Sequence, residues 1–228
     1  MADETKQPED DNFFDPHAER KKEELYVAPE KDNLVKKGAE VNLTRKDPAF
    51  KNALVGIGWD LKQYDRDPPD LDASVFLLNK NDKTRVDEDF IFYGNLSGCD
   101  GAVKHTGDSR TGAGEGDDET ILLDLNAIPF DVLKIVFTVS IYDLDMSENN
   151  FTHVKNVYFR LVNQETGHEI LRYDLDDELH TTDTGMIVGE LERIGADWIF
   201  RAVGENRHGG LVKIAALYGI IVLQDIPG

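Results

Sequence analysis

Only one cysteine, Cys99, occurs among the 228 residues, so the chain cannot form an intrachain disulfide. That scarcity fits a reducing compartment better than secretion. Long apolar stretches are also missing, because the longest runs, 135–141 and 217–223, are too short to span a bilayer. The first fifteen residues are acidic and lack the apolar segment of a signal peptide. We therefore expect a cytoplasmic protein.

Positive charge is scarce as well. The 25 Lys and Arg residues are outnumbered by 45 Asp and Glu residues, which gives a formal net charge of −20. A nucleic-acid partner is excluded on this ground, because binding phosphates requires a basic surface. Docking on an anionic membrane is excluded too, unless a bound cation first neutralises the acids.

An acidic extension occupies residues 1–33. It carries eleven acids and few large apolar side chains, so it cannot bury enough surface to offset the entropy of ordering. We expect this extension to be flexible and residues 34–228 to form the folded domain.

From Leu34 onward the sequence is typical of an all-β protein. Short runs rich in Val, Ile, Phe and Tyr are separated by turn residues, which predicts a sandwich or a barrel. The run Lys134–Tyr142 is almost wholly apolar and should be a central strand covered on both faces. Gly209 and Gly210 introduce one short C-terminal helix, Leu211–Leu217. The predicted strands are Glu40–Arg45, Leu54–Trp59, Ala73–Asn79, Asp89–Tyr93, Thr120–Leu125, Leu133–Tyr142, Asn156–Val162, Glu169–Asp174, Met186–Ile194 and Trp198–Val203.

The segment 106–119 combines four glycines with five acids, Asp108, Glu115, Asp117, Asp118 and Glu119. Glycines let a loop turn sharply, and clustered carboxylates stay ionised together only beside positive charge. Calcium, which takes six to eight oxygen ligands, meets that need. Phosphate binding is disfavoured, because the segment is strongly negative and has no lysine. A solvated acidic hairpin loop is the alternative.

A repeated triplet also favours a cation. Asp70-Leu71-Asp72 sends two carboxylates to one side of an extended chain and a leucine to the other. The two acids are then about 7 Å apart along the strand, close enough to share one ion. Related triplets begin at Asp124, Asp143 and Asp174, where simple strand alternation is the alternative.

Signatures of catalysis are thin. The sequence contains no nucleophile elbow and no HExxH motif. A carboxylate pair of the glycosidase type is possible in principle, but acids crowded beside glycines are more often ion ligands. We therefore expect a protein that is not an enzyme.

Several motifs, in order, resemble one known family, the TerD-like tellurite-resistance and general stress proteins. The motifs are Gly58-Trp59-Asp60, 70–78, 89–93, 106–119, 159–163, 200–204 and Gly209-Gly210-Leu211, which together span roughly 34–220. The resemblance implies a β-sandwich of two sheets that binds calcium through its acidic loops. Ser109 stands where the family motif commonly has Asn. The metal ligands implied are Asp60, Asp70, Asp72, Asp108, Ser109, Asp117, Asp118 and Glu119.

The function implied is that of a calcium-dependent binding or scaffold module of the stress response, whose partners are other proteins of a stress-response complex. One alternative is a calcium-dependent, membrane-associating module of the C2 kind, which calcium-dependent pelleting with vesicles would reveal. A carboxylate-based hydrolase is the other, and loss of turnover on replacing the loop acids would reveal it.

Overall fold

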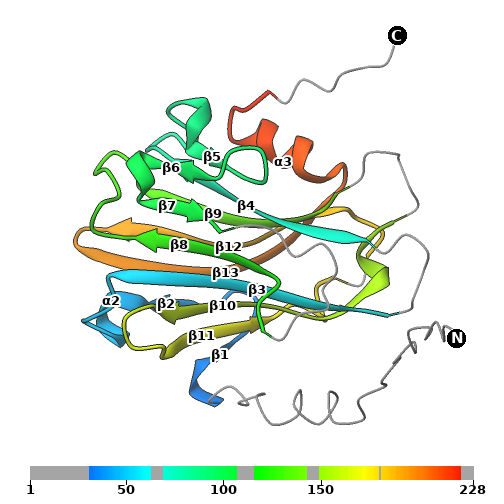
Figure 1. Ribbon diagram of the computed structural model, residues 1–228, viewed down its shortest axis with the longest axis horizontal. Coiled ribbons are helices and arrows are strands. Elements are labelled where there is room, and N and C mark those ends of the chain that lie inside the picture. Colours follow the sequence, from blue (N-terminus) through cyan, green and yellow to red (C-terminus); the bar gives the residue numbers. More distant parts are fainter. Residues whose placement is uncertain (1–30, 63–68, 107–115, 143–148, 180, 222–228) are drawn as a thin grey trace, which may run out of the picture.

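The computed structural model describes residues 31–62, 69–106, 116–142, 149–179 and 181–221. These residues form two β-sheets packed face to face, as the sequence predicts (Figure 1). No helix among them is long and apolar enough to cross a membrane. The predicted flexible extension lies almost wholly outside the described residues. Its last three residues form the 3-10 turn η1 (Lys31–Asn33), where the side chain of Asn33 is buried and donates to the carbonyl of Glu169.

The first sheet has β3 at its centre. Its order is β1 (Leu34–Val35), β11 (Glu169–Asp174), β10 (Val154–Asn163), β3 (Asn52–Leu61), β8 (Glu119–Asp124), β7 (Val103–His105) and β6 (Ser97–Gly98). Every pairing is antiparallel except that of β1 with β11.

The second sheet has β12 and β9 at its centre. Its order is β2 (Glu40–Asn42), β13 (Asp197–Arg207), β12 (Gly185–Ile194), β9 (Lys134–Tyr142), β4 (Asp70–Leu78) and β5 (Phe90–Ile91), all antiparallel. The prediction of a central strand at Lys134–Tyr142 is therefore confirmed.

The main core fills the space between the two sheets. Its centre is a row of rings in which Phe159 of β10 meets Phe137 of β9 and Phe200 of β13, with centroid separations of 5.2 and 5.4 Å. All three side chains are fully buried. These contacts join the two sheets, because Phe159 comes from one sheet and its two neighbours come from the other.

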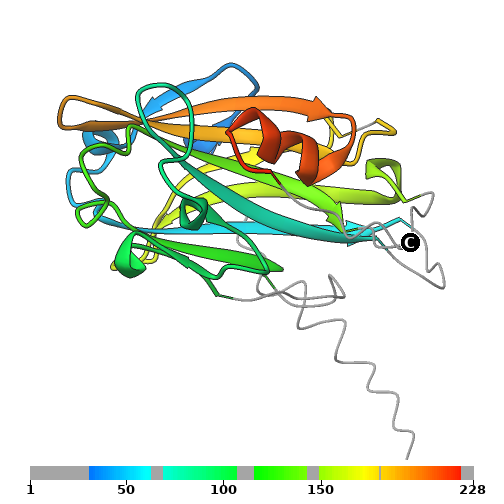
Figure 2. The same cartoon turned by 90° about the horizontal axis from the view of Figure 1, so that it is seen from above.

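A smaller core lies on the outer face of the second sheet, beneath α3 (Gly210–Leu217). Figure 2 shows this helix lying against the sheet, where Ile214 and Ala215 pack with Phe76, Val136 and Ile187. The approach is close, since a Cβ at Gly185 would lie 3.0 Å from the Cα of Gly210. The helix covers Val136 on the outer face of β9, while Ile135, Phe137, Val139 and Ile141 face the main core.

One predicted strand, Glu40–Arg45, is wrong in its second half. The strand β2 ends at Asn42, and residues Leu43–Lys46 form the short helix α2. The side chain of Asn42 accepts a hydrogen bond of 2.9 Å from the backbone N–H of Arg45 and so caps the helix. Local side-chain capping thus outweighs the β propensity of Thr44.

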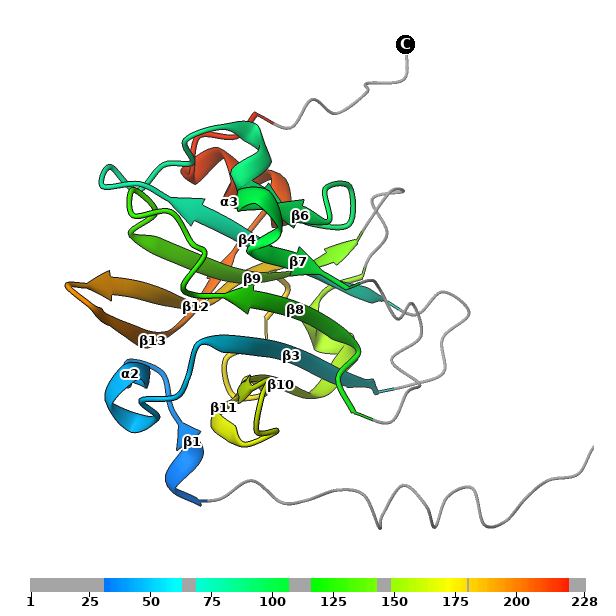
Figure 3. The same cartoon turned by 60° about the vertical axis from the view of Figure 1, so that its left-hand side comes forward.

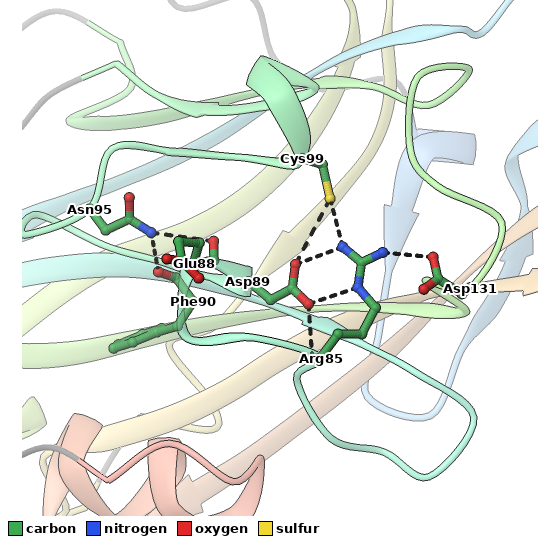
Figure 4. A network of polar contacts seen from close by, with 7 residues as sticks. All are labelled: Arg85, Glu88, Asp89, Phe90, Asn95, Cys99 and Asp131. Atoms are coloured by element: carbon green, nitrogen blue, oxygen red, sulfur yellow. Dashed lines mark hydrogen bonds and ion pairs between the residues drawn. The ribbon is translucent and has the colours of Figure 1, made fainter.

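A buried ion pair fixes the connection between β4 and β5 (Figure 4). Asp89, at the end of the 3-10 turn η2 (Asp87–Asp89), is 2% exposed and accepts two hydrogen bonds of 2.8 Å from the guanidinium of Arg85. The same guanidinium donates to Asp131 at 2.6 Å and to the Cys99 sulfur, in the turn η3 (Cys99–Gly101), at 3.2 Å. Burial raises the pKa of the Cys99 thiol, so it is protonated at neutral pH.

Candidate functional site

Five of the predicted ligands lie where strands of both sheets end. The register pairs Ile57 with Glu119 and Leu61 with Val154, so the end of β3 lies beside the starts of β8 and β10. The start of β4 belongs to the other sheet and approaches β8 through the bond from the backbone of Ala73 to Glu119. Figure 3 shows β3 and β8 side by side. We call this end of the sandwich, defined by Asp60, Asp70, Asp72, Asp118 and Glu119, the acidic end. Asp108 and Ser109 lie outside the described residues, so their role stays a prediction.

Asp118 is a buried acid of this group with a raised pKa. Its Oδ2 accepts a 2.8 Å hydrogen bond from the backbone N–H of Trp59, while its Oδ1 is buried and has no hydrogen-bond partner among the described residues. Burial raises the pKa of Asp118 to about 6; the Trp59 bond opposes the rise, and the charges of Asp60, Asp117 and Glu119 add to it. Added positive charge would therefore stabilise this position.

Glu119 links the two sheets. Its Oε2 lies 2.7 Å from Nε2 of His105 on β7 and 3.4 Å from the backbone nitrogen of Ala73 on β4, and both titratable side chains are 1% exposed. Burial lowers the pKa of His105, but the hydrogen bond and charge of Glu119, helped by Asp72, leave it raised overall. When His105 is protonated, its charge balances one of the buried carboxylates.

The side chain of Asp117 lies on the outer face of the first sheet and is held there by two other side chains. The guanidinium of Arg160 donates to its two oxygens at 2.8 and 2.9 Å, and the Tyr158 hydroxyl donates at 3.0 Å. The carboxylate lies flat on Gly56, where a Cβ would come within 2.2 Å of it. In this arrangement Asp117 neutralises Arg160, and its predicted role as a metal ligand is not tested.

Replacing Asp117 by Asn should lower the free energy of unfolding in chelator by about 1–3 kcal/mol, because the half-buried Arg160 loses the closer of its two charged partners and keeps only Glu169 at 3.4 Å. The stabilisation by calcium proposed below should survive. Urea denaturation with and without calcium measures both effects. Asp174→Asn is the control, since Asp174 pairs with Arg172 but is 59% exposed, and it should change stability by less than about 1 kcal/mol. If Asp117→Asn instead abolishes the stabilisation by calcium and leaves the free energy of unfolding in chelator unchanged, Asp117 is a ligand.

Asp60 is exposed, and its Oδ2 accepts a 2.7 Å hydrogen bond from the side-chain amide of Asn156 on β10. Asp70 and Asp72 begin β4, where Asp72 is 5% exposed and paired in register with Ser140 of β9. The sequence prediction that both acids of this triplet lie at a strand end is thus consistent with the structure.

The donors at the acidic end are carboxylate oxygens, which suit a hard cation such as calcium. Within the described ranges, no group of three or more His, Cys, Asp or Glu side chains is arranged to hold a metal ion by itself.

Sequence reasoning missed three residues that organise this end, namely His105, Asn156 and Arg160. His105 lies on a strand of three residues, too short for a periodic signal. Arg160 and Asn156 lie about 40 and 100 residues along the chain from the acids they contact, and only the register of the sheet brings them there.

Comparison with known proteins gives a consistent result. Residues 33–218 match the family described as the TerD domain. The chain is 48% identical to tellurium resistance protein TerD of Serratia marcescens over 184 residues, covering 81% of this chain and 95% of that protein. It is 44% identical to general stress protein 16U of Bacillus subtilis (strain 168) over 187 residues, covering 82% of this chain and 96% of that protein.

A solved structure supports the fold. The crystal structure of a homologue of telluride resistance protein (TerD) from Streptomyces coelicolor A3(2) superposes with a TM-score of 0.61 at 22% identity. The match covers 73% of this chain and 95% of that one. At this identity the likeness concerns the fold alone.

Proposed function

Because this chain belongs to the TerD domain family, we propose that it is a calcium-dependent binding or scaffold module of the stress response, and not an enzyme. Its relatives are named for tellurium resistance and general stress, which supports the same setting for this chain. Its partners would be other proteins of a stress-response complex, in the cytoplasm. The net charge of −20 argues against nucleic acid as the partner.

One observation carries the calcium proposal. Asp118 has a buried oxygen without a hydrogen-bond partner among the described residues, and its pKa of about 6 reflects burial beside three other acids. A buried, unpaired carboxylate destabilises the folded state unless a cation neutralises its charge. Asp118 and Asp60 would contribute ligand oxygens, and Asp70, Asp72, Asp108 and Ser109 stay predicted ligands.

The remaining acids have other tasks in this proposal. Glu119 is held by His105 and Ala73 and adds negative charge while it joins the sheets. Asp117 is held by Arg160. Calcium at the acidic end would relieve the repulsion among the acids and hold the strand ends in one arrangement. That arrangement would form a surface that a protein partner recognises only when the ion is bound.

The test is a thermal melt of chelator-treated protein titrated with calcium. An ion that binds only the folded state, at 100 times its Kd, stabilises by about 2.7 kcal/mol. For a domain of this size that corresponds to a rise in Tm of about 5–10 °C. Magnesium at the same concentration should give a smaller shift, because it retains its waters and takes fewer protein ligands.

Asp118→Asn makes the test specific. In chelator this variant should be at least as stable as the parent, because it removes a buried charge that its neighbours repel. In calcium it should lose most of the shift. Asp124→Asn, an exposed acid at the opposite end of β8, is the matched control and should keep the shift. If the parent responds to neither ion, the acidic end is solvated surface and calcium has no role here.

A further inference from the structure

Asn156 occupies an unusual backbone position at the acidic end. Lys155 pairs with Asp60 and Tyr158 with Gly58, so Asn156 and Val157 together oppose the single residue Trp59. This is a β-bulge, a feature that re-aims a side chain. Asn156 also has a φ of 53°, in the left-handed region where asparagine is tolerated better than most residues.

Asp176 holds the bulge in place. Its two carboxylate oxygens accept hydrogen bonds from the backbone N–H groups of Asn156, at 3.0 Å, and Val157, at 2.9 Å. The backbone N–H of Leu175 donates to the carbonyl of Val157 at 2.8 Å. The backbone groups that the bulge frees are thereby satisfied, and the left-handed turn is kept by contacts outside its own strand.

The bulge directs the side chain of Asn156 onto Asp60. The amide Nδ2 donates to Oδ2 of Asp60 at 2.7 Å. Asp60 directly follows Trp59, whose backbone N–H donates to Oδ2 of Asp118 at 2.8 Å. The Asp60 side chain makes no other hydrogen bond or ion pair with the described part of the chain. An amide suits this task, because it orients a carboxylate without neutralising it, whereas a lysine would compete with the cation.

We propose that Asn156 is a positioning residue. It fixes the exposed carboxylate of Asp60 beside Asp118, so that these ligand oxygens are already in place before calcium binds at the acidic end. Asp176 acts one step further out, through the bulge. This inference rests on the proposed function, since it assigns Asn156 a role at the same site. Partners of this kind orient metal ligands in many sites, and their loss costs 10–100-fold in affinity.

The test uses Asn156→Gly in the full chain. Glycine accepts a positive φ without strain, so the variant removes the amide and keeps the bulge. We expect an unchanged Tm in chelator and calcium affinity about 10-fold weaker by titration calorimetry. Asp82→Gly is the matched control, because Asp82 is also a left-handed, exposed residue (φ 54°) in the turn after β4, and it should leave the affinity unchanged.

The outcomes separate the two proposals. If the parent binds calcium and Asn156→Gly binds equally tightly, the positioning role is overturned and the proposed function stands. If the parent binds no calcium, the proposed function fails and Asn156 positions no cation ligand. The contact itself is measured in chelator, where the effects of Asn156→Gly and Asp60→Ala on stability should be coupled. Additive effects would show that the contact does not form, which also overturns the inference.

Discussion

Replacing Asp89 by Ala is expected to lower the free energy of unfolding by about 3 kcal/mol, at the lower end of the range for breaking a buried ion pair. The carboxylate is 2% exposed and takes hydrogen bonds from both the backbone and the guanidinium of Arg85. Its removal leaves Arg85, whose side chain is 22% exposed, with the exposed Asp131 and the Cys99 sulfur as its remaining partners. The Tm should fall by about 6–12 °C.

The control for this prediction uses the other partner of the same guanidinium. Asp131 is 68% exposed, so Asp131→Ala should cost less than about 1 kcal/mol. Urea midpoints at an unchanged m value compare the two variants. If the two variants lose the same free energy of unfolding, burial does not decide the strength of these ion pairs, and Asp89 is not the main partner of Arg85.

Phe159→Ala should destabilise the domain by about 3–5 kcal/mol, the range for truncating a fully buried phenylalanine. Phe159 is the ring by which the first sheet contacts Phe137 and Phe200 of the second. The loss therefore combines transfer of the ring out of the core with a cavity between the sheets. Denaturation in urea, in the presence of chelator, measures it without a contribution from bound ions.

The same substitution at an exposed ring provides the comparison. Phe130 is 92% exposed, and Phe130→Ala should change stability by no more than about 0.5 kcal/mol. Phe159→Leu should fall between the two, because it keeps most of the apolar volume and loses the ring contacts. A cost below about 1 kcal/mol for Phe159→Ala would show that the sheets repack around the gap.

Local pattern was sufficient for much of the fold. The almost wholly apolar run Lys134–Tyr142 predicted cover on both faces, and the structure supplies it with α3 on one side and the main core on the other. The glycine pair before Leu211 marked the helix start within one residue. Such signals are local, and propensity together with periodicity captures them.

Local pattern was misread at Asn42, which is a favoured N-cap residue and begins the helix Leu43–Lys46. It failed altogether where side chains act across strands. The acids of 117–119 are consecutive, but Asp117 lies on Arg160, Asp118 on the backbone of Trp59, and Glu119 beside His105. These three adjacent acids have different environments because of strand alternation and register. Counting the charges in the sequence reveals neither.

The strands at the borders of the two sheets limit how this protein meets others. In the described part of the chain, each sheet is bordered by strands of two or three residues, β1 and β6 in one sheet and β2 and β5 in the other. Very short border strands are one of the ways in which sheets avoid pairing with a second chain. We therefore expect a partner protein to contact side chains of this domain and not to add a strand to either sheet.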